Sequence, residues 1–203
     1  AFADATIRNF EANGIDTTFV GKVPNVSSGV APIFVEASGE NSILIVPGAN
    51  AHLLQADVEA AAEKLQACDL ILLQMEIPAQ TVYRTIAWAK ENGVKTLLNP
   101  APAAANLDVA EIASVDFLVP NETELAILSG LPVGNESEAE TAARSLISRG
   151  IGTVIVTRGS RGALLVEAES THRVDPVEVM SVDTTGAGDA FIGAFAHFYT
   201  DGL

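Results

Sequence analysis

The sequence predicts an α/β fold in three layers, with a mostly parallel central sheet and a small β-rich lid. From residue 55 onward, apolar stretches without a polar alternate face, such as DLILLQM (69–75) and GTVIVT (152–157), alternate with helical patterns. Strands of that kind are typical of a parallel sheet covered on both faces, and their alternation with helices indicates βαβ units. Ahead of them, residues 17–50 are rich in β-type patterns, which predicts the lid.

The predicted elements follow in order along the chain. A first helix ends at Asn13-Gly14, a common helix C-terminal signal. TTFVG (17–21) has the composition of a short strand, and two strands flank the turn signal SGEN (38–41). Helices are then expected at 55–67, 79–93, 121–130 and 137–150, and strands at 69–75, 94–100, 115–120, 152–157, 161–168 and 171–179. A last helix begins within the sequence GAGDAFIGAF (186–195).

The composition excludes some partners and compartments. The formal net charge of −15 argues against nucleic-acid binding, which needs clustered Lys and Arg. It is compatible with a small phosphate ligand, because a few local donors and a divalent cation can hold a polyanion. No apolar run reaches the roughly 18 residues of a membrane span. The single cysteine, Cys68, forms no internal disulfide, so we expect a cytoplasmic protein with Cys68 as a small core residue.

Polar or turn-forming residues follow each predicted strand of the main sheet. Ligands of open α/β sheets bind beyond the carboxyl ends of the strands. The segments at these ends are QMEIP (74–78), NPAPA (99–103), PNETE (120–124), TRGSRG (157–162) and DTTGAGD (183–189). Their convergence on one edge predicts a ligand site there.

The turn GAGD (186–189) has two interpretations. Gly186 and Gly188 let the backbone approach a ligand, and the helix that follows presents free N–H groups to an anion. Asp189 could then accept a proton from an attacking hydroxyl, although a helix N-terminus weakens a carboxylate as a base. Phosphoryl transfer tolerates a weak base, because it depends mostly on positioning and charge stabilisation. The alternative is a tight turn with an Asp that favours a helix start.

The amino-acid sequence of these segments resembles that of the ribokinase-like (PfkB) family of sugar and nucleoside kinases. DTTGAGDAFIGAF (183–195) is similar to the C-terminal signature of that family. Other segments agree in kind and order, namely SSGVAPIFV (27–35), GAN (48–50), NPAPA, PNETEL (120–125) and TRGSRGALL (157–165). The resemblance covers residues 1–203. We expect these residues to form a single ribokinase-like α/β domain that is partial relative to the family. Family members carry a Gly-Gly sugar-binding segment ahead of this region and a further segment after it.

The resemblance implies an ATP-dependent sugar kinase, a phosphotransferase with an alcohol group as acceptor. The substrate that the resemblance implies is ribose, phosphorylated at O5. Asp189 is then the general base, and Gly186, Ala187 and Gly188 form the anion hole. The implied ATP-binding residues are Asn121, Thr157, Arg158, Gly159, Ser160, Arg161, Gly162 and Gly188.

The resemblance also implies the remaining ligands. Glu76 belongs to the sugar pocket together with Asp189, and Glu124 organises Mg²⁺ through water. Asp183 and Thr185 match positions that contribute to a site for K⁺ or another monovalent cation. On the same basis we expect residues 17–50 to contribute part of a lid that excludes water and pairs two subunits into a homodimer.

Several alternatives remain open on the residues alone. Asn121 and Glu124 have the spacing of a helix capping box, and Gly159 and Gly162 suit an ordinary β-turn. Glu76 could end its strand only for solubility. Deoxyribose or another sugar or nucleoside could replace ribose as the substrate, and the same fold could serve as a non-catalytic nucleotide or metabolite sensor.

Overall fold

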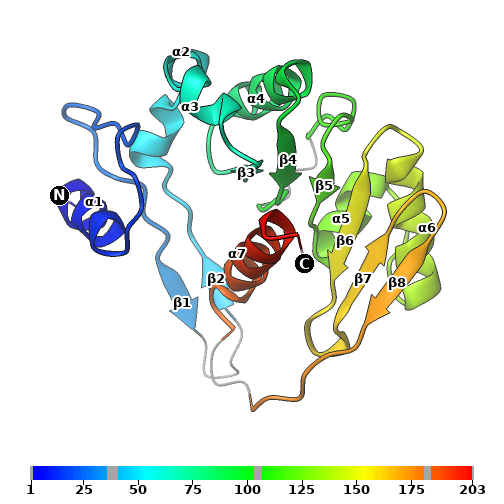
Figure 1. The fold of residues 1–203 in the computed structure, drawn as a ribbon. Coiled ribbons are helices and arrows are strands. Elements are labelled where there is room, and N and C mark those ends of the chain that lie inside the picture. Colours follow the sequence, from blue (N-terminus) through cyan, green and yellow to red (C-terminus); the bar gives the residue numbers. More distant parts are fainter. Residues whose placement is uncertain (1, 36–40, 103–106, 181–183, 203) are drawn as a thin grey trace.

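The computed structural model describes residues 2–35, 41–102, 107–180 and 184–202 and contains a six-stranded sheet (Figure 1). The strands lie side by side in chain order from β3 to β8. Their bounds are β3 Leu70–Leu73, β4 Lys95–Leu98, β5 Phe117–Leu118, β6 Thr153–Thr157, β7 Ala163–Val166 and β8 Thr171–Val174. Strands β3 to β6 are parallel, whereas β7 and β8 pair antiparallel at the end of the sheet. The predicted α/β fold with a mostly parallel sheet is confirmed.

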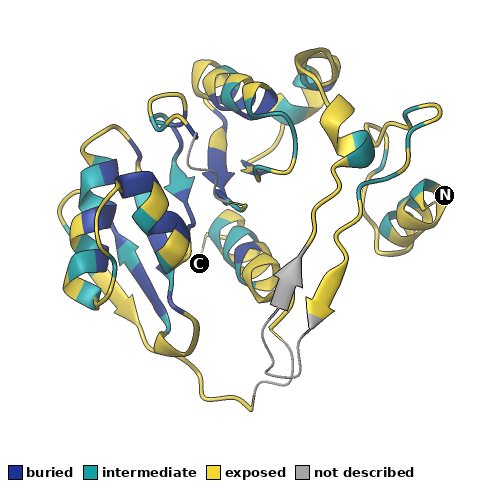
Figure 2. Cartoon of the chain, turned by 180° about the vertical axis from the view of Figure 1, so that it is seen from behind, coloured by how far each residue is buried: buried dark blue, intermediate teal, exposed yellow. Residues whose placement is uncertain are grey.

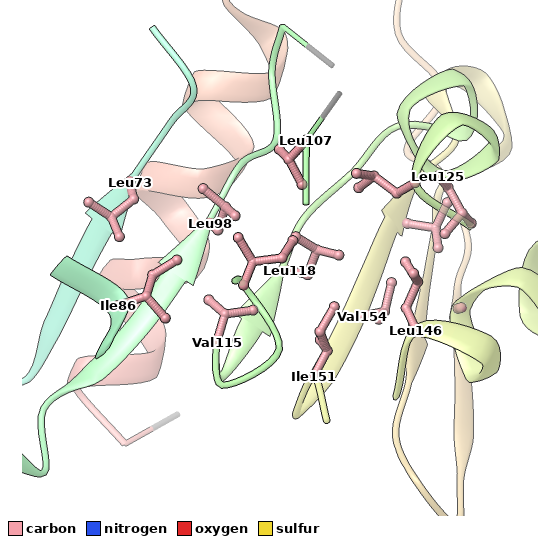
Figure 3. Close-up of a cluster of buried hydrophobic side chains, with 14 of the residues drawn as sticks. Leu73, Ile86, Leu98, Leu107, Val115, Leu118, Leu125, Leu146, Ile151 and Val154 are labelled. Atoms are coloured by element: carbon pink, nitrogen blue, oxygen red, sulfur yellow. The ribbon is translucent and has the colours of Figure 1, made fainter. Parts of the chain in front are cut away.

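Helices cover both faces of this sheet. One face packs against α4 (Ala79–Asn92), α5 (Glu122–Ser129) and α6 (Glu136–Ile147), and the other packs against α7 (Ala187–Thr200). The first core contains fully buried side chains from strands and helices, among them Leu98, Leu118, Ile86, Leu125 and Leu146 (Figure 3). The second core is smaller and consists of Leu97, Val119, Ile155 and Ile192.

Helix α4 shows why these segments become helices against a sheet. Its buried residues Val82, Ile86 and Ala89 recur every three or four positions, so they form one apolar stripe. The helix stops where Gly93 adopts the left-handed conformation with φ 74°, which a residue without a Cβ reaches at little cost. Helix α5 ends in the same way at Gly130, with φ 70°. After Gly93 the chain returns to the sheet as β4, and after Gly130 it continues into α6.

The N-terminal third of the chain, up to Gln66, contributes no strand to the six-stranded sheet (Figure 1). It contains α1 (Ala3–Ala12), the antiparallel pair β1 (Ile33–Val35) and β2 (Asn41–Ile43), the 3-10 helix η1 (Gly48–His52), and helices α2 (Gln55–Ala60) and α3 (Ala62–Gln66). Most of its described residues are exposed (Figure 2). Residues 17–50 were predicted to contribute part of a β-rich lid, and the β1–β2 pair lies within that range; the lid role stays a prediction.

Some local predictions were wrong. TTFVG (17–21) is not a strand, because the Asp16 carboxylate accepts the Thr18 N–H and bends the backbone into a turn. The expected helix 55–67 is divided at Ala61 into α2 and α3. Cys68 is exposed rather than buried, since it lies in the turn between α3 and β3. The turn SGEN lies largely outside the described residues.

None of the helices formed by the described residues is both long and apolar enough to span a membrane.

Candidate active site

The carboxyl ends of the four parallel strands form one edge of the sheet. Leu73 of β3 pairs with Leu98 of β4, and Leu98 pairs with Leu118 of β5. Neighbouring strands are about 4.8 Å apart, so the edge from β3 to β6 is on the order of 14 Å long. The site residues are therefore described from the β3 end to the β6 end.

A cavity of about 150 Å³ opens at the β3–β4 end of this edge. Its lining consists of Leu72, Leu73, Gln74, Asn99, Asp189, Ile192 and Gly193. Asp189 is exposed in the first turn of α7, whereas Ile192, one turn later, is buried against the sheet. The packing of Ile192 thus brings the first turn of α7, with the Asp189 carboxylate, to the ends of β3 and β4.

The sequence interpretation did not select Gln74 and Asn99 as site residues. Gln74 follows β3 directly and Asn99 follows β4 directly, so the rule on strand ends could have found both. The Asn99 amide oxygen accepts a hydrogen bond from the Ala101 N–H at 3.0 Å, which fixes the side chain at the cavity. Two carboxamides and one carboxylate therefore supply the polar atoms of an otherwise apolar cavity.

The start of α7 presents backbone amides beside this cavity. Gly186 has φ 74° and is the N-cap residue, and the first helical hydrogen bond runs from Ala190 N to Gly186 O at 2.9 Å. The Ala187 N–H already donates to Thr184 O at 3.1 Å. Within the described part of the chain, the N–H groups of Gly188 and Asp189 have no acceptor. Among the described residues the Gly186 N–H has no acceptor either, so only the Ala187 amide of the expected anion hole at 186–188 is already engaged, and the role of these residues stays a prediction.

Gly188 also leaves space for a ligand. A Cβ atom built on Gly188 meets no heavy atom within 4 Å. Packing against the protein therefore does not require glycine here. Open space next to unpaired amides at a helix N-terminus is the arrangement that binds phosphate groups.

The capping interpretation of Asn121 and Glu124 describes their geometry. Asn121 Oδ1 accepts the Glu124 N–H at 2.9 Å, and Glu124 Oε2 accepts the Asn121 N–H at 2.8 Å. Glu124 is only 9% exposed, and burial raises the pKa of its carboxyl above the usual range while the Asn121 amide partly opposes the rise. The capping box holds both side chains at the end of β5, where a ligand role stays a prediction.

The end of β6 lies beside this capping box. Asn121 and Thr157 form a parallel bridge, and the Thr157 N–H donates to Pro120 O at 2.9 Å. The structure thus joins two of the predicted ATP-binding segments, although 36 residues separate them in the sequence.

The loop after Thr157 divides the remaining predicted residues into two groups. Gly159 and Ser160 are exposed, and a Cβ on Gly159 meets nothing within 4 Å. Gly162 serves the fold, because a Cβ there would lie 2.0 Å from Val174 O. Arg158 is buried among carboxylates, and Arg161 is paired with Glu122. The part of this loop that is open to a ligand is therefore its backbone around Gly159 and Ser160.

The other predicted ligands are less well defined by the structure. Glu76 is exposed and is not part of the cavity lining. Thr185 lies in the exposed turn before α7, and Asp183 lies outside the described residues. No group of three or more His, Cys, Asp or Glu residues in the described ranges could hold a metal ion. A protein-only Mg²⁺ cage is thus missing there, whereas Mg²⁺ carried by nucleotide phosphates needs only one or two carboxylates and water.

Comparison with known proteins decides the family. The family model described as "pfkB family carbohydrate kinase" matches residues 1–203. The chain belongs to the pfkB family of carbohydrate kinases. The family expected from the motifs is therefore confirmed.

Individual members of this family are similar over nearly the whole chain. A deoxyribokinase of Salmonella typhi is 53% identical over 198 residues, which is 98% of this chain and 65% of that protein. A ribokinase of Staphylococcus aureus is 37% identical over 193 residues, 95% of this chain and 63% of that protein. The structure of Arabidopsis thaliana ribokinase complexed with ribose and ATP matches with a TM-score of 0.80 and 31% identity, covering 88% of this chain and 58% of that one. The chain spans 58% to 65% of the length of these relatives, which is less than two thirds.

Proposed function

We propose that the full-length protein transfers the γ-phosphoryl group of ATP to a primary hydroxyl of a pentose. One observation carries the proposal: the Asp189 carboxylate lies at a cavity beside the amides of Gly188 and Asp189, which have no acceptor within the described residues. A proton acceptor next to an anion-binding helix start is what phosphoryl transfer to an alcohol requires.

The proposed phosphoryl transfer uses a proton acceptor and anion-binding amides that this chain supplies. The sugar hydroxyl oxygen attacks the γ-phosphorus, the bond from that phosphorus to the β–γ bridging oxygen breaks, and ADP leaves. The hydroxyl proton passes to the Asp189 carboxylate. The amides of Gly188 and Asp189 donate to the transferring phosphoryl oxygens, and the dipole of α7 adds to this stabilisation.

The nucleotide occupies the β5–β6 end of the sheet edge in this proposal. Its phosphates run from the backbone around Gly159 and Ser160, past Asn121, toward the start of α7. Mg²⁺ bound to the phosphates would neutralise charge that develops there, with Glu124 contacting its water shell. The support lies in the capping box, which holds Asn121 and Glu124 in place at that edge.

The sugar occupies the cavity at the β3–β4 end. Gln74 and Asn99 are carboxamides that can both donate to and accept from sugar hydroxyls, and Glu76 stays a candidate just outside. Ribose was the expected substrate, but 53% identity to a deoxyribokinase against 37% to a ribokinase favours deoxyribose. We therefore propose 2-deoxyribose as the substrate, with ribose as the second candidate.

The lid and the cation site complete the proposal. We propose that residues 1–203 act as one unit in which the strand pair within 17–50 closes over the sugar and contacts a second subunit. Exposed apolar side chains support this, with Phe34 59% and Leu44 58% exposed. Light scattering on the full-length protein tests the dimer, and a monomeric mass would contradict it.

Activity with and without K⁺ tests the proposed monovalent cation site, and K⁺-independent turnover would remove that role. Fractionation of cells tests the expected cytoplasmic location, and recovery outside the cytoplasmic fraction would contradict it.

The decisive experiment measures ADP release by the full-length protein with ATP and a panel of sugars and nucleosides. Asp189→Asn should lower turnover by about 10² to 10⁴-fold, because it removes the proton acceptor and keeps the shape. The matched control is Asp201→Asn at the other end of α7, which should keep full activity. Nucleotide binding without turnover on any substrate would favour the sensor alternative, and near-normal turnover of Asp189→Asn would remove Asp189 from the mechanism.

A further inference from the structure

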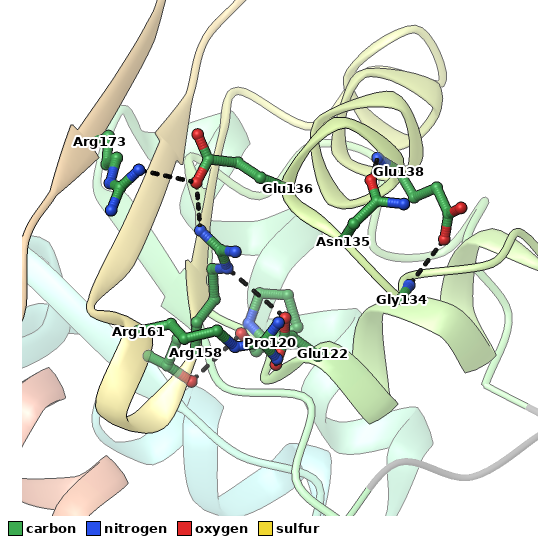
Figure 4. A network of polar contacts seen from close by, with 10 residues as sticks. Pro120, Glu122, Gly134, Asn135, Glu136, Glu138, Arg158, Arg161 and Arg173 are labelled. Carbon is green, nitrogen blue, oxygen red and sulfur yellow. Dashed lines mark hydrogen bonds and ion pairs between the residues drawn. The ribbon is translucent and has the colours of Figure 1, made fainter.

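Arg158 is a buried arginine whose charged partners within the described residues are carboxylates. Its side chain is 5% exposed, although arginine is among the residues least often buried. Its Nη1 lies 2.7 Å from Glu136 Oε2, and its Nε lies 3.5 Å from Glu122 Oε1 (Figure 4). Only the contact with Glu136 is a hydrogen bond, whereas Arg158 Nε and Glu122 Oε1 form an ion pair without one. Burying a charge is costly without partners, so the arrangement depends on the negative charge of both carboxylates.

The two carboxylates belong to the first turns of two consecutive helices. Glu122 is the first residue of α5 and Glu136 is the first residue of α6. Each helix has an asparagine N-cap directly before that glutamate, Asn121 for α5 and Asn135 for α6. A single guanidinium therefore ties the loop after β6 to the N-termini of both helices.

The network extends outward on both sides of Arg158. Arg161 contacts Glu122 Oε2, and Arg173 of β8 lies 3.6 Å from Glu136 Oε2. Arg161 and Arg173 are more than half exposed, so solvent screens their pairs. Arg158 is the buried centre of the network. Water cannot reach its guanidinium to replace the two carboxylates.

The direction of the Arg158 side chain separates it from the exposed loop backbone. Its guanidinium points to Glu122 and Glu136, whereas Gly159 and Ser160 are exposed. The Arg158 backbone closes the base of the loop, because its N–H donates to Gly162 O at 2.9 Å and its carbonyl accepts the Arg161 N–H at 3.1 Å. The side chain therefore fixes a loop whose other face is free for a ligand.

We propose that Arg158 is a positioning residue for the nucleotide, acting through the loop 157–162 and the capping box of α5. It holds the Gly159–Ser160 backbone and Asn121 in one fixed relation, so that both reach the same phosphate chain. This inference rests on the proposed kinase function and replaces the expectation that the Arg158 side chain touches ATP. Because the sugar cavity is lined by the ends of β3 and β4 and by α7, Arg158 affects the nucleotide and not the sugar.

The test compares the Michaelis constants for ATP and for the sugar in the full-length protein. Arg158→Met should raise the KM for ATP by about tenfold or more, since small misplacements of binding groups are costly, and leave the KM for the sugar within about twofold. Arg158→Lys keeps the charge but not the planar fork, and should give a smaller rise in the same constant. Glu136→Gln changes only one partner and covers the case in which Arg158→Met does not fold.

A matched control separates positioning from general stability. Arg144→Met also removes an arginine that anchors α6, but Arg144 contacts Glu140, Thr171 and the carbonyls of Glu167 and Ala168, at the β7–β8 turn. It should lower the Tm without changing the KM for ATP. Equal effects of the Arg158 and Arg144 variants on that constant, or an unchanged constant in both Arg158→Met and Glu136→Gln, would overturn the positioning role. Wild-type protein without ATP-dependent turnover would instead refute the proposed function, and this inference with it.

Discussion

Substitution of Glu124 separates a helix cap from a site for the metal–nucleotide complex. The side chain accepts the Asn121 N–H at 2.8 Å, and it is 9% exposed. Glu124→Gln keeps an amide oxygen in the same place, and glutamine serves equally well in a capping box. We expect its free energy of unfolding to stay within about 0.5 kcal/mol of wild type at neutral pH. Glu124→Ala loses the hydrogen bond and should unfold about 1 to 2 kcal/mol more easily.

The Mg²⁺ dependence of turnover should depend on the negative charge of Glu124 and not on its hydrogen bond in the capping box. Both variants lack the carboxylate that would hold water on Mg²⁺, so both should need more Mg²⁺ to reach half-maximal turnover. Urea unfolding and an Mg²⁺ titration of ADP release on the same full-length preparations give the two readouts. An unchanged Mg²⁺ titration for Glu124→Gln would leave Glu124 as a cap alone. A loss of stability as large as that of Glu124→Ala would refute the capping argument.

The pH dependence of stability follows from the same burial. Burial raises the pKa of the Glu124 carboxyl in the folded protein, so the folded state binds this proton more tightly than the unfolded state does. The protonated Glu124 carboxyl therefore stabilises the folded state. This stabilisation is fully present below the pKa of the carboxyl in the unfolded chain, and it is lost as the pH rises through the higher pKa of the folded protein. Glutamine does not titrate there. Wild type should therefore lose stability relative to Glu124→Gln between acidic and neutral pH, and a constant difference would contradict the raised pKa.

Substitutions of Gly188 and Gly162 should have opposite effects on stability. The Cβ of Gly188→Ala meets no atom within 4 Å and the alanine lies inside a helix, so the Tm should stay the same or rise. The methyl group would block the proposed phosphate space and lower turnover by at least about tenfold, and normal turnover would show that the space holds no ligand. Gly162→Ala places a Cβ 2.0 Å from Val174 O at φ 81°, so it should destabilise the protein by more than about 2 kcal/mol in urea unfolding; wild-type stability would contradict the close contact between the loop and β8.

Local patterns in the sequence were sufficient for the fold class and for locating several candidate site residues. The apolar strands of 69–75 and 152–157 and the glycine that ends α4 depend on periodicity and backbone preference, which neighbouring residues supply. The capping box of Asn121 and Glu124 is also local, since it spans three positions. The GAGD turn could be located for the same reason, and its left-handed Gly186 is a property of that residue type.

Only the tertiary structure decided which of these residues meet and what each side chain contacts. Gln74, Asn99 and Asp189 line one cavity because β3, β4 and α7 pack together, and no spacing in the sequence encodes that distance. The family resemblance implies Arg158 as an ATP-binding residue, yet its guanidinium pairs with carboxylates from two helices that pack on one face of the sheet. A side chain takes the partners that folding brings within a few ångströms, and the energy of a buried charge depends on those partners. The residue type and its place in the sequence cannot supply them.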